Sequence, residues 1–149
     1  MKSSAIILFT MLTLTSHVNA EEQTLDNFLS NFDYDARIEM KAGTKELVDL
    51  LKAGKVQLID IRFKEEYEAW HMDVAKNIPL NELPNRLNEL DKNKTIVTAC
   101  PHKDRAIIAM TFLKTKGYDV MYLKDGLIGL AEYLRGDNAK DFICAINKK

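Results

Sequence analysis

A cysteine and an arginine five positions apart are the residues of this chain best suited to carry out chemistry. Cys100 follows the apolar, β-branched run 95–99, and Arg105 lies where a helical pattern begins. The first turn of a helix presents free N–H groups and the positive end of a dipole, which stabilise a thiolate and bind anions. The placement predicts that Cys100 is a nucleophile for sulfur or phosphoryl transfer and that Arg105 binds an anionic group.

The residues between these two are polar or charged and predict a substrate-binding loop. We expect His102 and Lys103 to join Arg105 in binding an anionic substrate, because all three bring cationic or polar groups to the loop. Each assignment has an alternative. Cys100 as an inert buried thiol, Arg105 paired with Asp104 or a surface carboxylate, and a solvated rim of His102 and Lys103 all remain open.

Strand and helix patterns alternate along the chain and must position this loop. Strands are predicted at 56–61, 94–99 and 119–123, and helices at 25–32, 44–54, 64–70, 80–90, 105–116 and 127–134, with Thr44 as the N-cap of the second helix. Such alternation predicts an α/β fold with a parallel sheet covered on both faces. Ligands of such folds bind outside the carboxyl ends of the strands, where Cys100 lies.

Short motifs at these elements resemble those of the rhodanese family. They are Asp60-x-Arg62 at a strand end, Glu66-Tyr67, His71, Ala75, Asn77-Ile78-Pro79, the loop Cys100-x-x-x-x-Arg105, and Gly126. The ordered set covers about residues 44–134 and resembles a single-domain rhodanese. The resemblance implies a three-layer α/β sandwich with a central, mostly parallel sheet and helices on both faces.

The length of the loop connects this resemblance to an activity. Four residues separate Cys100 from Arg105, as in rhodaneses, whereas the related dual-specificity phosphatases have five around a larger phosphate. The resemblance implies a sulfurtransferase that needs no cofactor. Cys100 would take a sulfane sulfur from thiosulfate or polysulfide as a persulfide and pass it to a thiol, cyanide or protein acceptor. Asp60 and Arg62 would support the loop.

Three nearby side chains are expected to be structural. Arg62 and Glu66, four residues apart, predict a salt bridge of the scaffold. His71 is expected to hydrogen-bond a backbone group near Asn77.

Three loop residues depart from the family pattern and keep a second interpretation open. Lys103 stands where the family usually has glycine, Pro101 has no N–H to donate, and Asp104 puts a negative charge where anions should bind. The alternative function is a catalytically weak or inactive rhodanese-like binding or sensor module. Phosphatase or arsenate reductase chemistry is a further enzymatic alternative, against which the short loop argues.

The first twenty residues have the composition of a secretory signal peptide. Lys2 precedes an apolar run at 5–14, and small residues lead to Ala20. Cleavage after Ala20 predicts a periplasmic or secreted protein without a stable membrane anchor, with an uncleaved anchor as the alternative. The rest divides into an N-terminal arm (21–43), a rhodanese-like domain (44–135) and a C-terminal tail (136–149) packed on the domain.

Charge and residue counts limit which partners, metals and disulfides the chain is expected to have. The chain of 149 residues has a formal charge of −1, which gives no reason to expect nucleic acid as a partner. After cleavage only His71 and His102 remain as histidines, and no metal-binding spacing is present. The two cysteines are Cys100 and Cys144. A buried structural thiol is favoured for Cys144, while a resting disulfide or a resolving role remains open.

Overall fold

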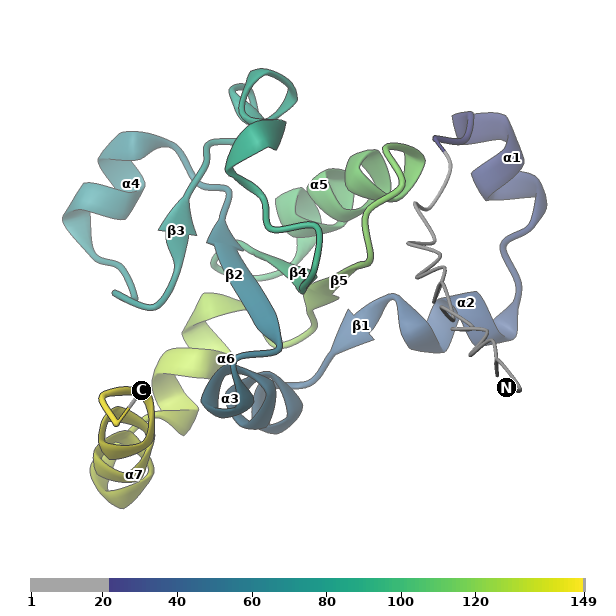
Figure 1. The fold of residues 1–149 in the computed structure, drawn as a ribbon. Helices are drawn as coiled ribbons and strands as arrows, with labels where there is room; N and C mark the ends of the chain where they lie inside the picture. Colours follow the sequence, from purple (N-terminus) through teal and green to yellow (C-terminus); the bar gives the residue numbers. More distant parts are fainter. Residues whose placement is uncertain (1–21, 149) are drawn as a thin grey trace, which may run out of the picture.

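A computed structural model describes residues 22–148, so the predicted signal peptide and its cleavage site lie outside the described residues. A single five-stranded sheet lies at the centre of the fold (Figure 1). Its strands are β1 (Lys41–Ala42), β2 (Val56–Asp60), β3 (Lys76–Asn77), β4 (Thr95–Ala99) and β5 (Val120–Leu123). They follow the order β1-β5-β4-β2-β3, and every pairing is parallel. The parallel sheet is therefore confirmed.

Helices cover both faces of this sheet. The described residues form the helices α1 (Leu25–Ser30), α2 (Tyr34–Glu39), α3 (Thr44–Ala53), α4 (Lys64–Ala69), α5 (Asp104–Thr115), α6 (Gly126–Tyr133) and α7 (Gly136–Ile146). Of these, α3, α5, α6 and α7 contribute buried residues to the cores on the two faces. Successive residues of β4 belong to different cores, Ile96 to one and Val97 to the other, because side chains alternate across a strand. The helix α5 covers the first core, and α3, α6 and α7 cover the second (Figure 1). The three-layer α/β sandwich is confirmed.

The predicted helix at 80–90 is wrong. Its leucines lie instead in two short 3₁₀ turns, η1 (Leu83–Asn85) and η2 (Leu87–Glu89). Pro84 explains the difference, since proline lacks the N–H that a continuous helix would use and disfavours helical backbone at the preceding residue. The turns still bury Leu83 and Leu90 against the core that α5 covers.

The N-terminal arm contains α1, which the pattern at 25–32 predicted, together with α2 and β1, which sequence patterns did not predict. The C-terminal tail forms α7, which was also not predicted as a helix. The strand β1 pairs with β5, and so the arm ends as an edge strand of the sheet. The helix α7 packs against α3 through the buried Phe142. Between residues 22 and 148, no helix combines the length and the apolar character that crossing a membrane requires.

Candidate active site

Cys100 lies directly after β4, at the carboxyl edge of the sheet, and α5 begins four residues later at Asp104. Its side chain is completely buried, with 0% exposed. The strand pairs with β2 on one side and β5 on the other, and so the cysteine occupies the middle of the sheet edge. This is the position at which parallel α/β folds place their ligands.

The first turn of α6 holds the carbonyl groups of the loop. The N–H of Leu127 donates to the Cys100 carbonyl at 2.9 Å, and the N–H of Ile128 donates to the Pro101 carbonyl at 3.3 Å. Hydrogen bonding from the backbone N–H groups of Ala106 and His102 acts to lower the pKa of the Cys100 thiol. The carbonyls of Cys100 and Pro101 are thus taken up by α6, and the start of α5 lies beside the nucleophile, where a helix N-terminus favours an anionic sulfur.

The Cys100 thiol is nevertheless not pre-ionised. Burial is the largest influence and raises the pKa of the thiol above its ordinary value, and the N–H groups of Ala106 and His102 only partly offset it. The Asp104 carboxylate raises the pKa further, because its Oδ1 lies 3.5 Å from Sγ. Hydrogen bonds from the Arg105 N–H and from the thiol lower the pKa of Asp104. The resting pair is a thiol donating to a carboxylate.

Arg105 makes a two-bond ion pair with Glu66 of α4. Nη1 lies 2.6 Å from Oε2 and Nη2 lies 2.9 Å from Oε1, with 27% of the arginine and 37% of the glutamate side chain exposed. The hydrogen bonds from Arg105 lower the pKa of Glu66, and those same bonds raise the pKa of Arg105. Of the options open for Arg105, the structure shows a pair with a carboxylate.

Glu66 is thus the site residue that sequence reasoning missed. The predicted Arg62–Glu66 salt bridge is wrong, because the Glu66 carboxylate points to Arg105 and Arg62 pairs with Asp60. The one available signal was the Glu66-Tyr67 motif. Nothing local, however, connects Glu66 with a residue 39 positions away.

Asp60 and Arg62 form a buried ion pair that supports α4, the helix on which Glu66 lies. Arg62 Nη2 lies 2.6 Å from Asp60 Oδ2, and both side chains are at most 1% exposed. The same guanidinium donates to the carbonyls of Glu66 at 3.4 Å and Trp70 at 2.8 Å. It also lies 4.1 Å from the centre of the Trp70 ring. The pair therefore anchors α4, the helix that carries Glu66, at its middle and at its C-terminal end.

The histidine of this segment has a different partner from the one predicted. Nδ1 of His71 lies 2.9 Å from the Tyr67 carbonyl, and its ring stacks on that of Tyr67. The amide of Asn77 instead donates to the carbonyls of Asp60 at 2.9 Å and Arg62 at 3.0 Å. The His71 contact expected near Asn77 is wrong.

His102 and Lys103 are exposed at the rim of the loop. Lys103 is the N-cap of α5 with φ −156°, and among residues 22–148 only glycines have positive φ. The backbone at Lys103 therefore does not require the glycine that the family usually has there. The lysine is accommodated without strain and places a cation beside the loop.

The two cysteines are free thiols in different environments. Cys100 is buried, and Cys144 of α7 is exposed rather than buried as predicted, because Phe142 is the residue that α7 turns inward. Over the described range 22–148, no cluster of three or more histidine, cysteine or acidic side chains is arranged to hold a metal ion.

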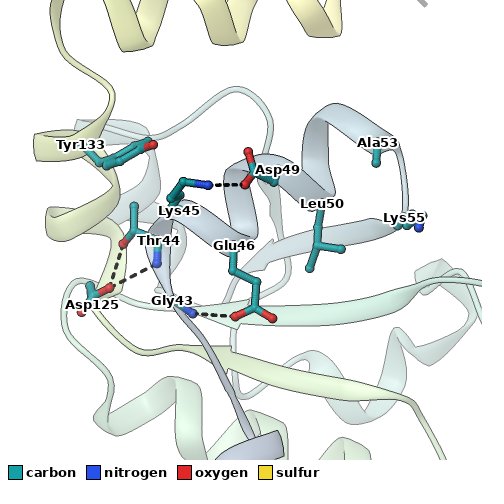
Figure 2. Close-up of a pocket in the computed structure, with 10 residues that line it drawn as sticks. All are labelled: Gly43, Thr44, Lys45, Glu46, Asp49, Leu50, Ala53, Lys55, Asp125 and Tyr133. Carbon is teal, nitrogen blue, oxygen red and sulfur yellow. Dashed lines mark hydrogen bonds and ion pairs between the residues drawn. The ribbon is translucent and has the colours of Figure 1, made fainter.

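A surface hollow lies away from Cys100, beside the start of α3 (Figure 2). It has a volume of about 770 Å³ and includes Asp125, which accepts hydrogen bonds from the N–H and the hydroxyl of Thr44 at 3.2 and 3.0 Å. Gly43, not Thr44, is the N-cap of α3, and the predicted cap is wrong. Asp125 also precedes Gly126, and so its bonds to Thr44 help to position the α6 turn that holds the loop.

Comparisons with known proteins agree with this arrangement. The chain is 37% identical over 101 residues to the uncharacterized protein YqhL of Bacillus subtilis, covering 66% of this chain and 77% of that protein. It is 30% identical over 81 residues to thiosulfate sulfurtransferase GlpE of Shewanella oneidensis, covering 54% of this chain and 80% of that enzyme. It is also 34% identical over 113 residues to an HTH-type transcriptional regulator of Mycobacterium tuberculosis. This match covers 74% of this chain but only 50% of that relative.

A solved structure and a family profile also match this chain. The fold matches a rhodanese-like domain protein from Staphylococcus aureus with a TM-score of 0.56 and 28% identity, over 60% of this chain and 89% of that one. The family profile of the rhodanese-like domain matches residues 43–132, which include Cys100, Arg105, Glu66 and the Asp60–Arg62 pair. The chain belongs to the rhodanese-like domain family.

Proposed function

We propose that this protein is an exported sulfurtransferase that moves sulfane sulfur through a persulfide on Cys100. The observation that carries the proposal is the position of Cys100 at the carboxyl edge of the sheet, just before α5, in a loop whose Cys100 and Pro101 carbonyls accept hydrogen bonds from α6. The N-terminus of α5 favours negative charge on that sulfur, whether it is a thiolate or a persulfide anion. The family supports the same chemistry, since its relatives include a thiosulfate sulfurtransferase.

With thiosulfate as donor the first half-reaction is a displacement at sulfur. The Cys100 thiolate forms a bond to the outer sulfur, the S–S bond of the donor breaks, and sulfite leaves with the bonding electrons. The proton of the resting thiol must first leave Sγ, and the Asp104 carboxylate 3.5 Å away accepts its hydrogen bond. Arg105 and the loop N–H groups are the groups that would hold the donor's anionic oxygens.

The second half-reaction returns the enzyme to its thiol form. A thiol, cyanide or a protein thiolate attacks the outer sulfur of the Cys100 persulfide, and Sγ leaves as the thiolate. No electrons enter or leave the system in either step, and so the side chains of this site suffice. His102 and Lys103, both exposed at the rim, are the side chains that the incoming anions would meet first.

Transfer to cyanide tests the activity. The purified chain, incubated with thiosulfate or polysulfide and cyanide, should form thiocyanate, and Cys100→Ser should form none above the background without protein. Cys144→Ser is the matched control, because it removes the exposed thiol and leaves the loop intact. Equal thiocyanate formation by wild type and Cys100→Ser would exclude the proposed nucleophile.

The export proposal rests on the first twenty residues and needs its own test. When the full-length chain is expressed in a bacterial host, we expect a periplasmic product whose N-terminal residue is Glu21. Mass spectrometry of the fractionated protein measures both. A cytoplasmic product that retains Met1 would contradict the proposed localisation and would leave the sulfurtransferase proposal standing.

A further inference from the structure

Glu66 is held in position before any substrate arrives. Its Oε2 accepts a hydrogen bond from the Phe63 N–H at 3.3 Å in addition to the 2.6 Å contact with Arg105 Nη1. The helix that carries it is anchored by Arg62, which donates to the carbonyls of Glu66 and Trp70. The carboxylate is therefore held beside Arg105 by contacts within the protein itself.

This carboxylate changes the charge that a donor meets. Arg105 is the cation expected to bind the donor, and two of its five N–H donors already bond to Glu66. Asp104 adds a second negative charge 3.5 Å from Sγ. We call Glu66, Lys103, Asp104 and Arg105 the mouth of the site. Its two negative charges, on Glu66 and Asp104, are matched by two positive charges, on Arg105 and the exposed Lys103. The deeper Asp60–Arg62 pair is neutral as a unit. The mouth thus has no excess of positive charge.

On the basis of the proposed sulfurtransferase function, we propose that Glu66 makes the site selective for sulfane-sulfur donors with a single negative charge. Organic persulfides, R–S–S⁻, are the substrate class that fits. Dianionic thiosulfate gains less from a guanidinium that a carboxylate has already neutralised, and it is repelled by Glu66 and Asp104. Glu66 acts through Arg105 and is a positioning residue.

The transfer from a persulfide balances without any co-reactant. The Cys100 sulfur forms a bond to the terminal sulfur of the donor, and the S–S bond of the donor breaks. The leaving sulfur takes the bonding electrons and, in net terms, the proton that Sγ gives up. The products are a Cys100 persulfide anion and the thiol R–SH, so that a Cys100 thiol and a singly charged donor react at constant total charge.

Two donors that differ mainly in charge test this proposal. Methanethiosulfonate, CH₃–SO₂–S⁻, has the same reacting S–S bond as thiosulfate, with a methyl group in place of one charged oxygen. Its transfer releases methanesulfinate where thiosulfate releases sulfite. The measurement is kcat/KM for each donor with cyanide as acceptor, in wild type, Glu66→Gln and Glu65→Gln.

Glu66→Gln keeps the shape of the side chain and one acceptor oxygen but removes its charge. We expect kcat/KM for thiosulfate to rise about tenfold, and that for methanethiosulfonate to change less than about threefold. Glu65→Gln removes the same charge from the neighbouring position of α4, for which no contact with Arg105 is found, and should change the ratio of the two donors less than about twofold.

The outcomes separate this proposal from the one on which it rests. If Cys100 forms no persulfide with either donor, the sulfurtransferase function itself is wrong. If it does, but the donor ratio is the same in Glu66→Gln and wild type, only the specificity proposal is overturned.

A measurement on the wild type serves if Glu66→Gln does not fold. Its kcat/KM for thiosulfate should change less than about twofold between about 20 mM and about 300 mM KCl, because the mouth has no excess positive charge to screen. A tenfold or larger fall with salt would show a strongly attractive site and contradict the proposal.

Discussion

Gly126 lies directly against the carbonyl group of His102. A Cβ placed on this glycine would approach the carbonyl oxygens of His102 and Pro101 to 2.3 Å each, well inside any real contact distance. Its φ of +66° belongs to the left-handed region, which glycine alone enters without strain. The next two N–H groups along α6 hold the carbonyls of Cys100 and Pro101, and so one glycine allows the helix to determine the shape of the loop.

The first prediction concerns this glycine. Gly126→Ala should abolish sulfur transfer and lower the free energy of unfolding by at least about 2 kcal/mol, because the loop backbone has to move away from the added methyl group. Sulfur transfer to cyanide and urea denaturation measure the two effects.

Gly136→Ala is the matched control for backbone strain. Gly136 also has a positive φ, +54°, but no atom lies within 4 Å of its Cβ position. This variant should lose about 1 to 2 kcal/mol of stability and keep full activity. If both variants keep activity, the contact between Gly126 and the loop does not matter for function.

The second prediction concerns the buried pair behind α4. Asp60→Asn leaves the Arg62 guanidinium buried without its carboxylate, and such uncompensated charges destabilise proteins by about 3 to 5 kcal/mol. Urea denaturation should show this loss. The control is Asp49→Asn, which removes one partner of the exposed Lys45–Asp49 pair and should leave stability unchanged. A loss for Asp60→Asn no larger than for the control would refute the supporting role of this pair.

The third prediction is a pH dependence. The Asp104 carboxylate raises the pKa of Cys100, because a thiolate beside a carboxylate is repelled. Asp104→Asn should therefore lower the midpoint of the pH profile for alkylation of Cys100 by iodoacetamide and increase the rate at neutral pH. Asp137→Asn, which changes the acidic residue in the first turn of α7, should leave the profile as in wild type. An unchanged or raised midpoint in Asp104→Asn would contradict the assigned contact.

The raised pKa of the Cys100 thiol also predicts how the stability of the protein depends on pH. Because burial raises the pKa of Cys100 in the folded protein, folding favours the protonated thiol. Its contribution is complete below the ordinary thiol pKa and is lost as the pH rises through the folded-state pKa. The urea midpoint of wild type should thus fall at alkaline pH more than that of Cys100→Ser, and parallel pH profiles would argue against a buried, protonated thiol.

The fifth prediction distinguishes the two thiols by their access to solvent. An aromatic disulfide reagent such as dithionitrobenzoate should react quickly with the exposed Cys144 and slowly with the buried Cys100. Cys144→Ser should remove only the fast phase. A native protein whose thiols appear only after reduction would instead contain the disulfide that the structure does not show between these residues.

The parts of the fold that the sequence alone predicted are those encoded by residues close together in the chain. The strands β2, β4 and β5 and the helix α5 follow from residue patterns within a few positions, and the loop from Cys100 to Arg105 follows from a short motif. The strand β1 has only two residues and exists because it pairs with β5, a contact that no local pattern encodes. In η1, Pro84 was a visible signal that the leucine periodicity outweighed.

The site shows the same division between local and distant signals. Cys100 and Arg105 were identifiable because their types and spacing carry the chemistry. The Glu66–Arg105 pair joins segments that come together only when β2 and β4 align. The complete burial of Cys100 depends on packing in the core that α5 covers. Charge at the mouth of the site, and therefore donor preference, required the tertiary structure.

The most direct test of the account is the mass of Cys100 after exposure to a sulfane-sulfur donor. Wild-type protein treated with thiosulfate, methanethiosulfonate or polysulfide, freed of donor and analysed as intact protein and as peptides, should carry one additional sulfur atom on the peptide containing Cys100. Cyanide should remove that sulfur as thiocyanate. If the Cys100 peptide gains no mass with any of the three donors, while the Cys144→Ser protein is folded and equally unmodified, Cys100 does not carry sulfur and the account is wrong.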